Sequence, residues 1–463
     1  MINRNFLLII FQVFLLQNAS ASFQDNLFKE IIDENKGENV IFSPLSLYQV
    51  ISLVLNGGSG KTREEIFKVL FPDKDLNEQL IKDINSNIEK IVTDLKPESE
   101  DNIGDAEDEF QIAEEAEDGN TDDRVTFNNV NALFYREGIS FKDEFKEICT
   151  QYNTSYLKLE SAEQVNNYVS NHTNGKIKNI IDSIDNIRLF MIINALYFKG
   201  SWDEKFYESA TKKRAFKNPN GIVMVDTMYQ NYESGLYYED EKVQMISLHY
   251  RSYNIPYKMT IILPNEKEYS SPMDYLNKEK INFHEISSKL NEEEIIHLYL
   301  PKFKYESEID FVSILEKLGM KLAFTDSADF SNLVDGQCFI SKLFQKTYIN
   351  LNENGTEAAA ATAIEIVGSP ENQEVEIQHY MYVNHSFIYM IESDEIKDID
   401  NHNIMPFIGI VNYVDPTEDP KDDPTEKPKD DPTDEPEKIL PVNLGNNSKV
   451  SFGIICFILL SYL

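Results

Sequence analysis

The residues of this chain that could do catalytic or ligand chemistry do not have the spacing that such chemistry needs. Residues 55–62 read LNGGSGKT, but a phosphate-binding loop requires a glycine five positions before Gly60, where the chain has Leu55. None of the seven histidines lies in an HExxH pair, and no GxSxG motif occurs. The sequence therefore predicts no enzyme, no metal site and no cofactor. It favours a helix end at Asn56-Gly57-Gly58.

One segment near the C-terminus has a pattern that would suit a change of structure. Residues 353–370 read ENGTEAAAATAIEIVGSP, in which four alanines favour a helix by propensity. The segment also fits a strand with one uncharged face, made of Thr356, Ala358, Ala360, Thr362, Ile364, Ile366 and Gly368. Glu357 and Glu365 would lie on the opposite face. Because an unpaired buried charge costs several kcal/mol, an uncharged face allows a loop to enter the interior of a sheet.

Composition limits the classes of function. The chain has 463 residues, 41% of them hydrophobic, so it can bury a sizeable core. Its formal net charge of -36 argues against nucleic-acid binding, which needs a basic surface. Cys149 and Cys338 are the only cysteines outside the terminal tails, which leaves at most one disulfide bridge. Buried thiols are favoured over that bridge.

The N-terminus has the pattern of a secretory signal peptide over residues 1–21. Arg4 precedes an apolar run at 6–16, and Ala19-Ser20-Ala21 forms a small-residue cleavage site. The sequence therefore predicts an extracellular protein. Secretion would make four Asn-x-Ser/Thr sites candidates for glycosylation, namely Asn153, Asn171, Asn354 and Asn384.

The C-terminus predicts a stalk and a membrane anchor. Residues 417–442 are acidic, and a proline at every fourth position from Pro416 to Pro436 favours an extended spacer without a core. Residues 443–463 pass from small residues to an apolar end that is too short to span a bilayer, which needs about 20 residues. This order predicts a glycolipid-anchor signal. A short permanent anchor and a tail that packs on the protein are the alternatives.

An acidic insert interrupts the globular part at residues 97–124. Positions 98–123 contain thirteen Asp or Glu and no Lys or Arg, without the Asp-x-Asp-x-Asp-Gly spacing of a calcium loop. A solvated loop is the favoured interpretation. A site for a cation or for a basic partner is the alternative.

The periodicity of the remaining sequence predicts an α+β fold. Helices are expected over 43–55, 61–71 and 78–95. Strands are expected over 126–134, 189–198, 258–263, 294–300, 345–351, 387–391 and 407–413. Helices dominate the first part of the chain and strands the later part, without the βαβ alternation of a parallel α/β fold.

Five motifs resemble those of the serpins, a family of serine protease inhibitors, and occur in the family's order. They are NVIFSPLSLYQVISLVLNGGSGKT at 39–62, IINALYFKGSWDEKF at 192–206, LPKFKYES at 300–307, QKTYINLNENGTEAAAATA at 345–363, and the pair VNHSFIYMI and PFIGIVNYVDP before the stalk. The resemblance implies a serpin domain over 22–416. Such a domain has three β-sheets, about nine helices and an exposed reactive centre loop, here at about 353–383.

The resemblance also implies a mechanism and its residues. In this family a protease attacks the loop as a substrate, and at the acyl-enzyme stage the cut loop inserts into the large sheet and distorts the protease. The hinge would be Gly355, Thr356, Glu357, Ala358, Ala359, Ala360, Ala361 and Thr362. The sheet-opening region would be Ser43, Pro44, Ser46, Asn194, Trp202 and Gln345. The family's spacing puts the reactive bond between Ser369 and Pro370, with the neighbours Val367, Gly368 and Asn372 as alternatives.

The predicted function is a secreted or surface-tethered serpin that inhibits a serine protease, with cysteine proteases as further candidate targets. No Lys or Arg occurs between Lys346 and Lys397, so an elastase-like or other non-basic specificity fits better than a trypsin-like one. The alternative is a non-inhibitory serpin that acts as a binding or carrier protein. Gln345, where the family usually has histidine, and Asn354, where an acid is usual, support that alternative. A monomer is expected.

Overall fold

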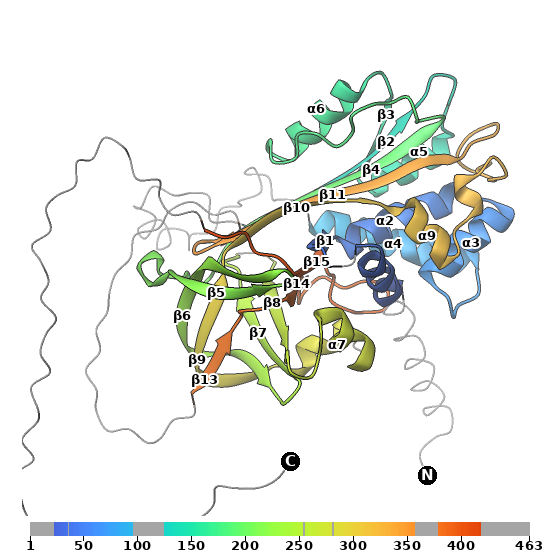
Figure 1. Ribbon diagram of the computed structural model, residues 1–463. Helices are drawn as coiled ribbons and strands as arrows, with labels where there is room; N and C mark the ends of the chain where they lie inside the picture. Colours follow the sequence, from blue (N-terminus) through green and yellow to red (C-terminus); the bar gives the residue numbers. More distant parts are fainter. Residues whose placement is uncertain are drawn as a thin grey trace, which may run out of the picture. The chain divides into compact units, whose positions relative to one another are not determined.

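Long strands from distant parts of the chain form two β-sheets, and helices gather at one end of them (Figure 1). The structure is a computed structural model that describes residues 23–35, 37–95, 125–252, 255–279, 282–356 and 378–417. These residues all belong to one compact unit, Met1–Thr417. The predicted signal peptide, acidic insert and anchor signal, and the stalk after Thr417, lie outside the described residues and stay predictions.

The first sheet has six strands. Their order is β10 (Phe303–Asp310), β11 (Ile340–Asn352), β12 (Gly355–Thr356), β4 (Phe190–Ser201), β2 (Thr126–Tyr135) and β3 (Thr154–Lys158). β4 and β11 are parallel and also pair directly, from Phe190 opposite Ile340 to Tyr197 opposite Tyr348. The two residues of β12 lie between β4 and β11 near their ends, antiparallel to both.

The second sheet has nine strands. Their order is β1 (Val40–Phe42), β15 (Phe407–Val411), β14 (Phe387–Ser393), β8 (Tyr257–Pro264), β7 (Val243–His249), β6 (Gly221–Glu239), β9 (Asn291–Pro301) and β13 (His379–Tyr382), and β5 (Lys212–Asn218) also pairs with β6. The 19-residue β6 joins two strand sets, because its first residues pair with β5 and its last with β7, while β9 pairs with it from Thr227 to Tyr237. With the six-stranded sheet, the described strands form three sets, as predicted.

Eight helices carry labels in the described part of the chain. They are α2 (Pro44–Gly57), α3 (Gly60–Leu70), α4 (Glu78–Asp94), α5 (Asp143–Gln151), α6 (Ala162–His172), α7 (Pro272–Glu279), α8 (Phe283–Ile286) and α9 (Phe311–Leu318). Residues 23–34 are helical as well. The α+β prediction with about nine helices is therefore confirmed.

Helix α2 begins and ends where its sequence indicates. Ser43 is the N-cap, and its hydroxyl accepts a hydrogen bond from Ser46 N at 3.1 Å, while Pro44 follows at the first helical position. At the other end, Gly58 N donates to Val54 O. α3 then begins at Gly60. The LNGGSGKT motif is thus a helix–helix connection rather than a phosphate loop.

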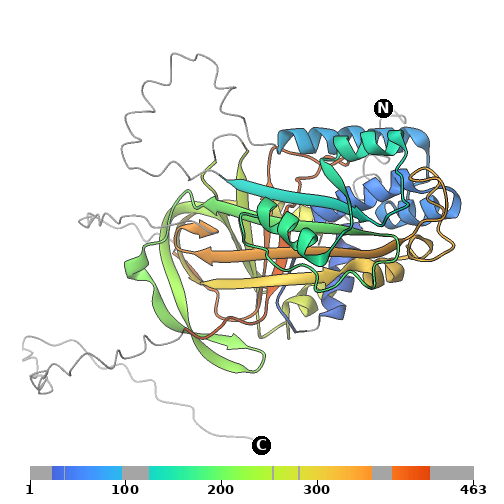
Figure 2. The same ribbon diagram turned by 90° about the horizontal axis from the view of Figure 1, so that it is seen from above.

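Two hydrophobic cores meet on the inner face of the six-stranded sheet. On β4, Phe190 and Ile192 belong to the core among the helices, whereas Leu196 and Phe198 belong to the core against the nine-stranded sheet. A third cluster lies on the opposite face of the sheet, where α6 covers it (Figure 2). Inward residues on a strand are two apart, so Asn194 lies where the two inner cores separate.

The two cysteines of the globular part are free thiols. Cys149 and Cys338 are both buried and unbridged, which confirms the prediction. Burial raises the pKa of each thiol to about 12. Both are therefore protonated and inert at neutral pH.

No described helix is both long and apolar enough to cross a membrane. The described residues contain no group of three or more His, Cys, Asp or Glu that could hold a metal ion.

Asp25, on the helix at 23–34, should make the stability of the domain depend on pH. Burial raises the pKa of its carboxyl from 3.8 to about 7. Between these values the unfolded chain has lost the proton that the folded chain keeps, so the free energy of unfolding should fall as the pH rises. The Asp25→Asn variant should therefore have a melting temperature several degrees above that of the wild type at pH 8. Below pH 4 the two melting temperatures should be equal.

The exposed Asp33 on the same helix provides the control. Asp33→Asn should leave the melting temperature nearly unchanged at both pH values in scanning calorimetry. If Asp25→Asn shifts the melting temperature equally at pH 4 and pH 8, ionisation of the Asp25 carboxyl is not the cause of the shift.

Candidate functional site

Three buried amide side chains form a row across the six-stranded sheet. Gln345 on β11 is the direct partner of Asn194 on β4, which in turn is the partner of Asn131 on β2. Their exposed fractions are 1%, 0% and 4%. Gln345 Nε2 donates to Asn194 Oδ1 at 2.6 Å, and Asn194 Nδ2 donates to Asn131 Oδ1. We call Gln345, Asn194 and Asn131 the polar row.

The polar row separates two apolar regions along each strand. On β11, Leu343 belongs to the core among the helices and Ile349 to the core against the nine-stranded sheet. A buried polar group without a partner costs about 1–3 kcal/mol. The amides must therefore form hydrogen bonds with one another and with the groups of the helix that packs on them. This requirement restricts the register of the three strands.

The first turn of α2 bonds to both sides of the junction between β4 and β11. Gln345 Oε1 accepts from Ser43 N at 2.7 Å, and Gln345 Nε2 donates to Ser43 O at 3.2 Å. Asn194 Nδ2 donates to Ser46 Oγ. Because Gln345 belongs to β11 and Asn194 to β4, this turn of α2 holds the two strands together.

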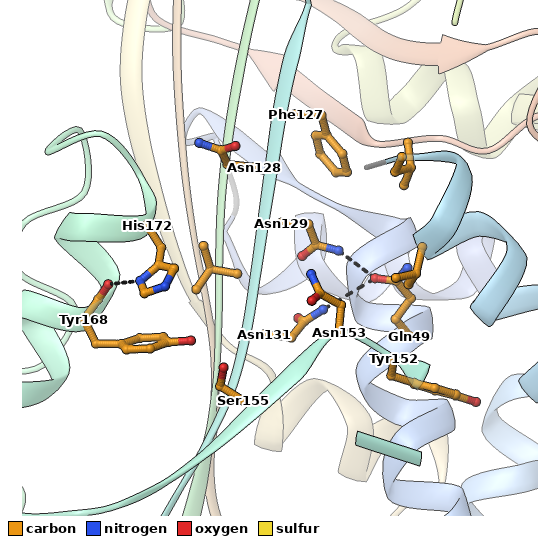
Figure 3. A pocket seen from close by; sticks show the side chains of 13 residues that line it. Gln49, Phe127, Asn128, Asn129, Asn131, Tyr152, Asn153, Ser155, Tyr168 and His172 are labelled. Atoms are coloured by element: carbon orange, nitrogen blue, oxygen red, sulfur yellow. Dashed lines mark hydrogen bonds between the residues drawn. The ribbon is translucent and has the colours of Figure 1, made fainter. Parts of the chain in front are cut away.

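The next turn of α2 extends the network to β2, and Figure 3 shows the hydrogen bonds of Gln49 with Asn129 and Asn131 on that strand. Gln49 Oε1 accepts from Asn129 Nδ2 at 2.6 Å, and Ser46 Oγ donates to Asn129 Oδ1 at 2.6 Å. A strand that entered between β4 and β11 would move them apart by about 4.8 Å, one strand spacing. The bonds of α2 to one of the two strands would then break, at a net cost of about 0.5–1.5 kcal/mol each.

The start of the predicted hinge already lies between the ends of β4 and β11. Gly355 is opposite Ser201, and Thr356 is opposite Gly200. Thr356 is fully buried, and its hydroxyl shares a hydrogen bond of 2.8 Å with Tyr250 Oη. Burial raises the pKa of Tyr250, so the phenol stays neutral. The junction therefore admits the first strand residues of the hinge.

The turn before β12 is held from two directions. Trp202 Nε1 donates to Asn352 O at 3.1 Å, and Trp202 N donates to Asn354 O at 2.9 Å. Glu353 forms an ion pair with Lys302 at 2.9 Å. Although burial opposes ionisation, hydrogen bonds from Lys302 and Thr211 hold the pKa of the Glu353 carboxyl below its usual value.

The six residues of the predicted sheet-opening region lie at two places. Ser43, Pro44, Ser46, Asn194 and Gln345 come together at the polar row and the first turn of α2. Trp202 lies apart from them, beside β12, where its ring stacks on Tyr250 with centroids 4.6 Å apart.

Sequence reasoning missed Gln49, Asn129, Asn131 and Tyr250. A signal existed for the first three. Gln49 follows Ser46 by three residues, so both face the same side of α2. Asn129 and Asn131 are polar residues on the inward side of a strand that otherwise turns Leu133 and Phe127 inward. No local pattern indicated Tyr250, which directly follows β7.

The remaining predicted site residues are only partly described. Asn153, Asn171 and Asn384 are exposed, whereas Asn354 is 7% exposed, so a glycan on Asn354 would require its turn to open. From the hinge, Gly355 and Thr356 are described. The remaining hinge residues at 357–362 and the reactive-bond residues Val367, Gly368, Ser369 and Pro370 lie outside the described part of the chain.

Comparisons with known proteins agree with this geometry. The family model Serpin (serine protease inhibitor) matches residues 18–411. An uncharacterised serpin-like protein of Thermococcus kodakarensis is 31% identical over 392 residues, covering 82% of this chain and 83% of that protein. The leukocyte elastase inhibitor of Xenopus tropicalis is 26% identical, and the match covers 83% of this chain and 97% of that protein. The crystal structure of Serpin48 from the insect Tenebrio molitor superposes with a TM-score of 0.68 at 26% identity. The match covers 86% of this chain and 98% of that structure.

These matches correct the prediction that the chain is simply not an enzyme. The matched family is described as serine protease inhibitor, and one relative is named an elastase inhibitor. Proteins of this family act on proteases, as inhibitors. The matches show no catalytic activity for this chain.

Gly355→Ala should displace β12 from the junction. Gly355 has a φ of +146°, and a Cβ there would lie 2.1 Å from Gly200 O and 2.7 Å from Ser201 Cα. Trp202 is the only tryptophan and bonds to the turn before β12, so its fluorescence reports this displacement. We expect the emission to shift to longer wavelength and the stability to fall by about 1–3 kcal/mol.

Gly336→Ala is the matched control. Gly336 also has a positive φ, +116°, but a Cβ there would meet nothing within 4 Å. This variant should carry the backbone strain and leave the emission of Trp202 unchanged. If both variants shift the emission equally, contact between residue 355 and β4 is not what places β12.

Proposed function

The chain belongs to the serpin family, and we propose that it inhibits a serine protease by inserting its cleaved reactive centre loop between β4 and β11. The protease would cut the loop and, while still bound as an acyl-enzyme, be carried away as the loop enters the sheet. The observation that carries this proposal is the register of β12, because it specifies where each following hinge residue would go.

Two pairs on each side define that register. Gly355 and Thr356 lie opposite Ser201 and Gly200 on β4, and opposite Asn352 and Leu351 on β11. If β12 continued in this register, each inward residue after Thr356 would lie between one residue of β4 and one of β11. Ala358 would lie between Phe198 and Ile349, and Ala360 between Leu196 and Thr347. Thr362 would lie between Asn194 and Gln345, and Ile364 between Ile192 and Leu343.

The chemistry of these residues suits their neighbours. Thr362, the only hydroxyl among the four, would reach the polar row, where it could bond to the amides that the separating strands release. Ile364 would reach the apolar core among the helices, where full burial contributes about 1.5–3 kcal/mol. The small Ala358 and Ala360 would fit beside large core residues without overpacking.

The ends of the loop explain why cleavage would be required. β12 belongs to the six-stranded sheet and β13, on the other side of the loop, to the edge of the nine-stranded sheet. An intact loop is therefore held at both ends in different sheets. A cut between them would free the hinge side to extend β12 and leave the other side attached to β13.

The proposed target does not cut after basic residues. Positions 347–396 contain no Lys or Arg, and the family's spacing favours the bond between Ser369 and Pro370, or neighbours at Val367 and Gly368. An elastase-like protease suits such small and aliphatic residues. The name of the Xenopus tropicalis relative, leukocyte elastase inhibitor, supports this choice.

Ala360→Arg should turn the inhibitor into a substrate. The side chain would point inward next to Leu196, where an unpaired charge costs several kcal/mol, so insertion should stop. Ala361→Arg is the matched control, because residue 361 would point to the solvated face. Each protein is incubated with elastase-, chymotrypsin- and subtilisin-type proteases, and SDS-resistant adducts are measured on gels.

The wild type and Ala361→Arg should form the adduct, and Ala360→Arg should be cut with an adduct yield lower by about tenfold or more. The cleaved wild type should also melt higher than the intact protein. Cleavage of the wild type without adduct or gain in melting temperature would reject inhibition and favour a non-inhibitory binding or carrier protein.

We also infer that the protein is secreted and held at a cell surface by a glycolipid. This inference is supported by the predicted signal peptide at 1–21 and anchor signal at 443–463. The chain leaves the domain at a defined point, since Asp226 N on β6 donates to Thr417 Oγ1 at 2.8 Å. The stalk would separate the domain from the membrane.

Phospholipase C specific for phosphatidylinositol tests the anchor. Treatment of membranes from cells that express the full chain should release most of the protein, because the enzyme cleaves the lipid and not the polypeptide. A chain that ends at residue 442 should appear in the medium without treatment. Retention of the full chain after treatment would contradict a glycolipid anchor.

A further inference from the structure

Two carboxylates and two basic side chains lie close together at the connection between β14 and β15. This connection folds back on itself, since Asp398 N donates to His402 O at 2.9 Å. We call residues 396–404 the β14–β15 tip. The tip carries Asp398, Asp400 and His402, and Lys74 reaches it from the connection between α3 and α4.

All four of these side chains are largely buried. Their exposed fractions are 14% for His402, 11% for Asp398, 12% for Lys74 and 6% for Asp400. Lys74 Nζ lies 2.9 Å from Asp400 Oδ1, and His402 Nδ1 lies 3.5 Å from Asp398 Oδ2. Lys74 therefore compensates one carboxylate, and a protonated His402 compensates the other. Without that proton the buried cluster has an excess negative charge, which is costly.

The carboxylates of the tip hold the proton on His402. Although burial opposes protonation, the hydrogen bond and the charge of Asp398 raise the pKa of His402 above its usual 6.5. The charge of Asp400 acts in the same direction, and that of Lys74 acts against it. Burial raises the pKa of Asp400, and Lys74 counters this rise. From α2, Tyr48 lies near the carboxylates, and burial raises the pKa of this phenol, which stays neutral.

The tip is packed against the first turn of α2 and against α4. Leu45 N, at the start of α2, donates to the O of Met405 directly after the tip at 3.4 Å. Ile396 and Ile404 of the tip form a buried cluster with Leu45 and with Ile91 of α4. The tip thus supports the same turn of α2 that forms hydrogen bonds with the polar row.

We propose that the β14–β15 tip is a pH-sensitive support of α2, which holds the first turn of α2 on the polar row when His402 is protonated and loosens when that proton is lost. His402 binds its proton more tightly in the folded chain than in the unfolded one. Its contribution to stability is therefore complete below about pH 6.5 and is lost as the pH rises through the folded pKa.

The tip would also affect the ease of loop insertion. A strand that enters between β4 and β11 must break the bonds of the first turn of α2 to one of the two strands. A loosened tip lets this turn move, so insertion after cleavage should be faster at high pH. This consequence rests on the proposed function, whereas the pH-dependent support of α2 does not.

Two conservative variants remove the switch. His402→Gln keeps a polar side chain that cannot take up a charge. Asp398→Asn removes the charge that raises the pKa of His402, while its Oδ1 can still accept from Asp400 N and His402 N, as the carboxylate does. His249→Gln is the matched control, because His249 is exposed at the end of β7.

The test follows hydrogen exchange of amides 43–50 by mass spectrometry, and the melting temperature, on the full chain at pH 6.0 and 8.5. Each variant is compared with the wild type at the same pH, which cancels the intrinsic pH dependence of exchange and the effect of Asp25. At pH 6.0 both tip variants should exchange this segment about three- to tenfold faster and melt about 1–3 °C lower. At pH 8.5 they should match the wild type, and His249→Gln should match it at both pH values.

A difference between His402→Gln and the wild type that is equal at both pH values, or absent at pH 6.0, would overturn the proposal. If His402→Gln does not fold, the same comparison with Asp398→Asn decides.

The rate of SDS-resistant adduct formation with one elastase-type protease is measured at the same two pH values. Faster adduct formation by His402→Gln than by the wild type at pH 6.0, and equal rates at pH 8.5, would support the link to insertion. Equal rates at pH 6.0 would overturn that link. If no adduct forms at all, the proposed inhibition fails while the exchange result stands.

Discussion

Hydrogen bonding among a few buried amides is the constraint on which the rest of this structure depends. Gln345, Asn194 and Asn131 lie in one row across three strands, between two apolar cores, and all three are buried. Their partners come from one another and from the first turns of α2. The same bonds that close the sheet are therefore those that an entering strand would break.

The junction between β4 and β11 is held closed along most of its length and is occupied by β12 near its end. Direct parallel pairing runs from Phe190 to Tyr197 on β4, and β12 lies beyond it at Gly200 and Ser201. Lengthening β12 would exchange one parallel pairing for two antiparallel ones and bury further apolar surface. That exchange gives a physical reason for the proposed insertion to be favourable once the loop is cut.

Much of the fold could be read from sequence because local patterns decided it. The helix that begins after Ser43 and the strands around Asn194 and Gln345 appear where the periodicity placed them. The site was predicted less completely. Trp202 lies beside β12, apart from the other residues of the predicted sheet-opening region, and the candidate glycosylation site Asn354 is 7% exposed. Both outcomes depend on contacts between segments distant in sequence.

The sequence by itself determined which residues can tolerate burial: the uncharged face that starts at Thr356, the amides within apolar strands, and the capped start of α2. These properties follow from residue type and from the period of helix and strand. Only the tertiary structure decided that Gln345, Asn194 and Asn131 share one register and that α2 bonds to both strands of the junction. Such facts depend on how strands far apart in the chain align, because a hydrogen bond requires its partners within about 3 Å and sequence spacing does not specify that distance.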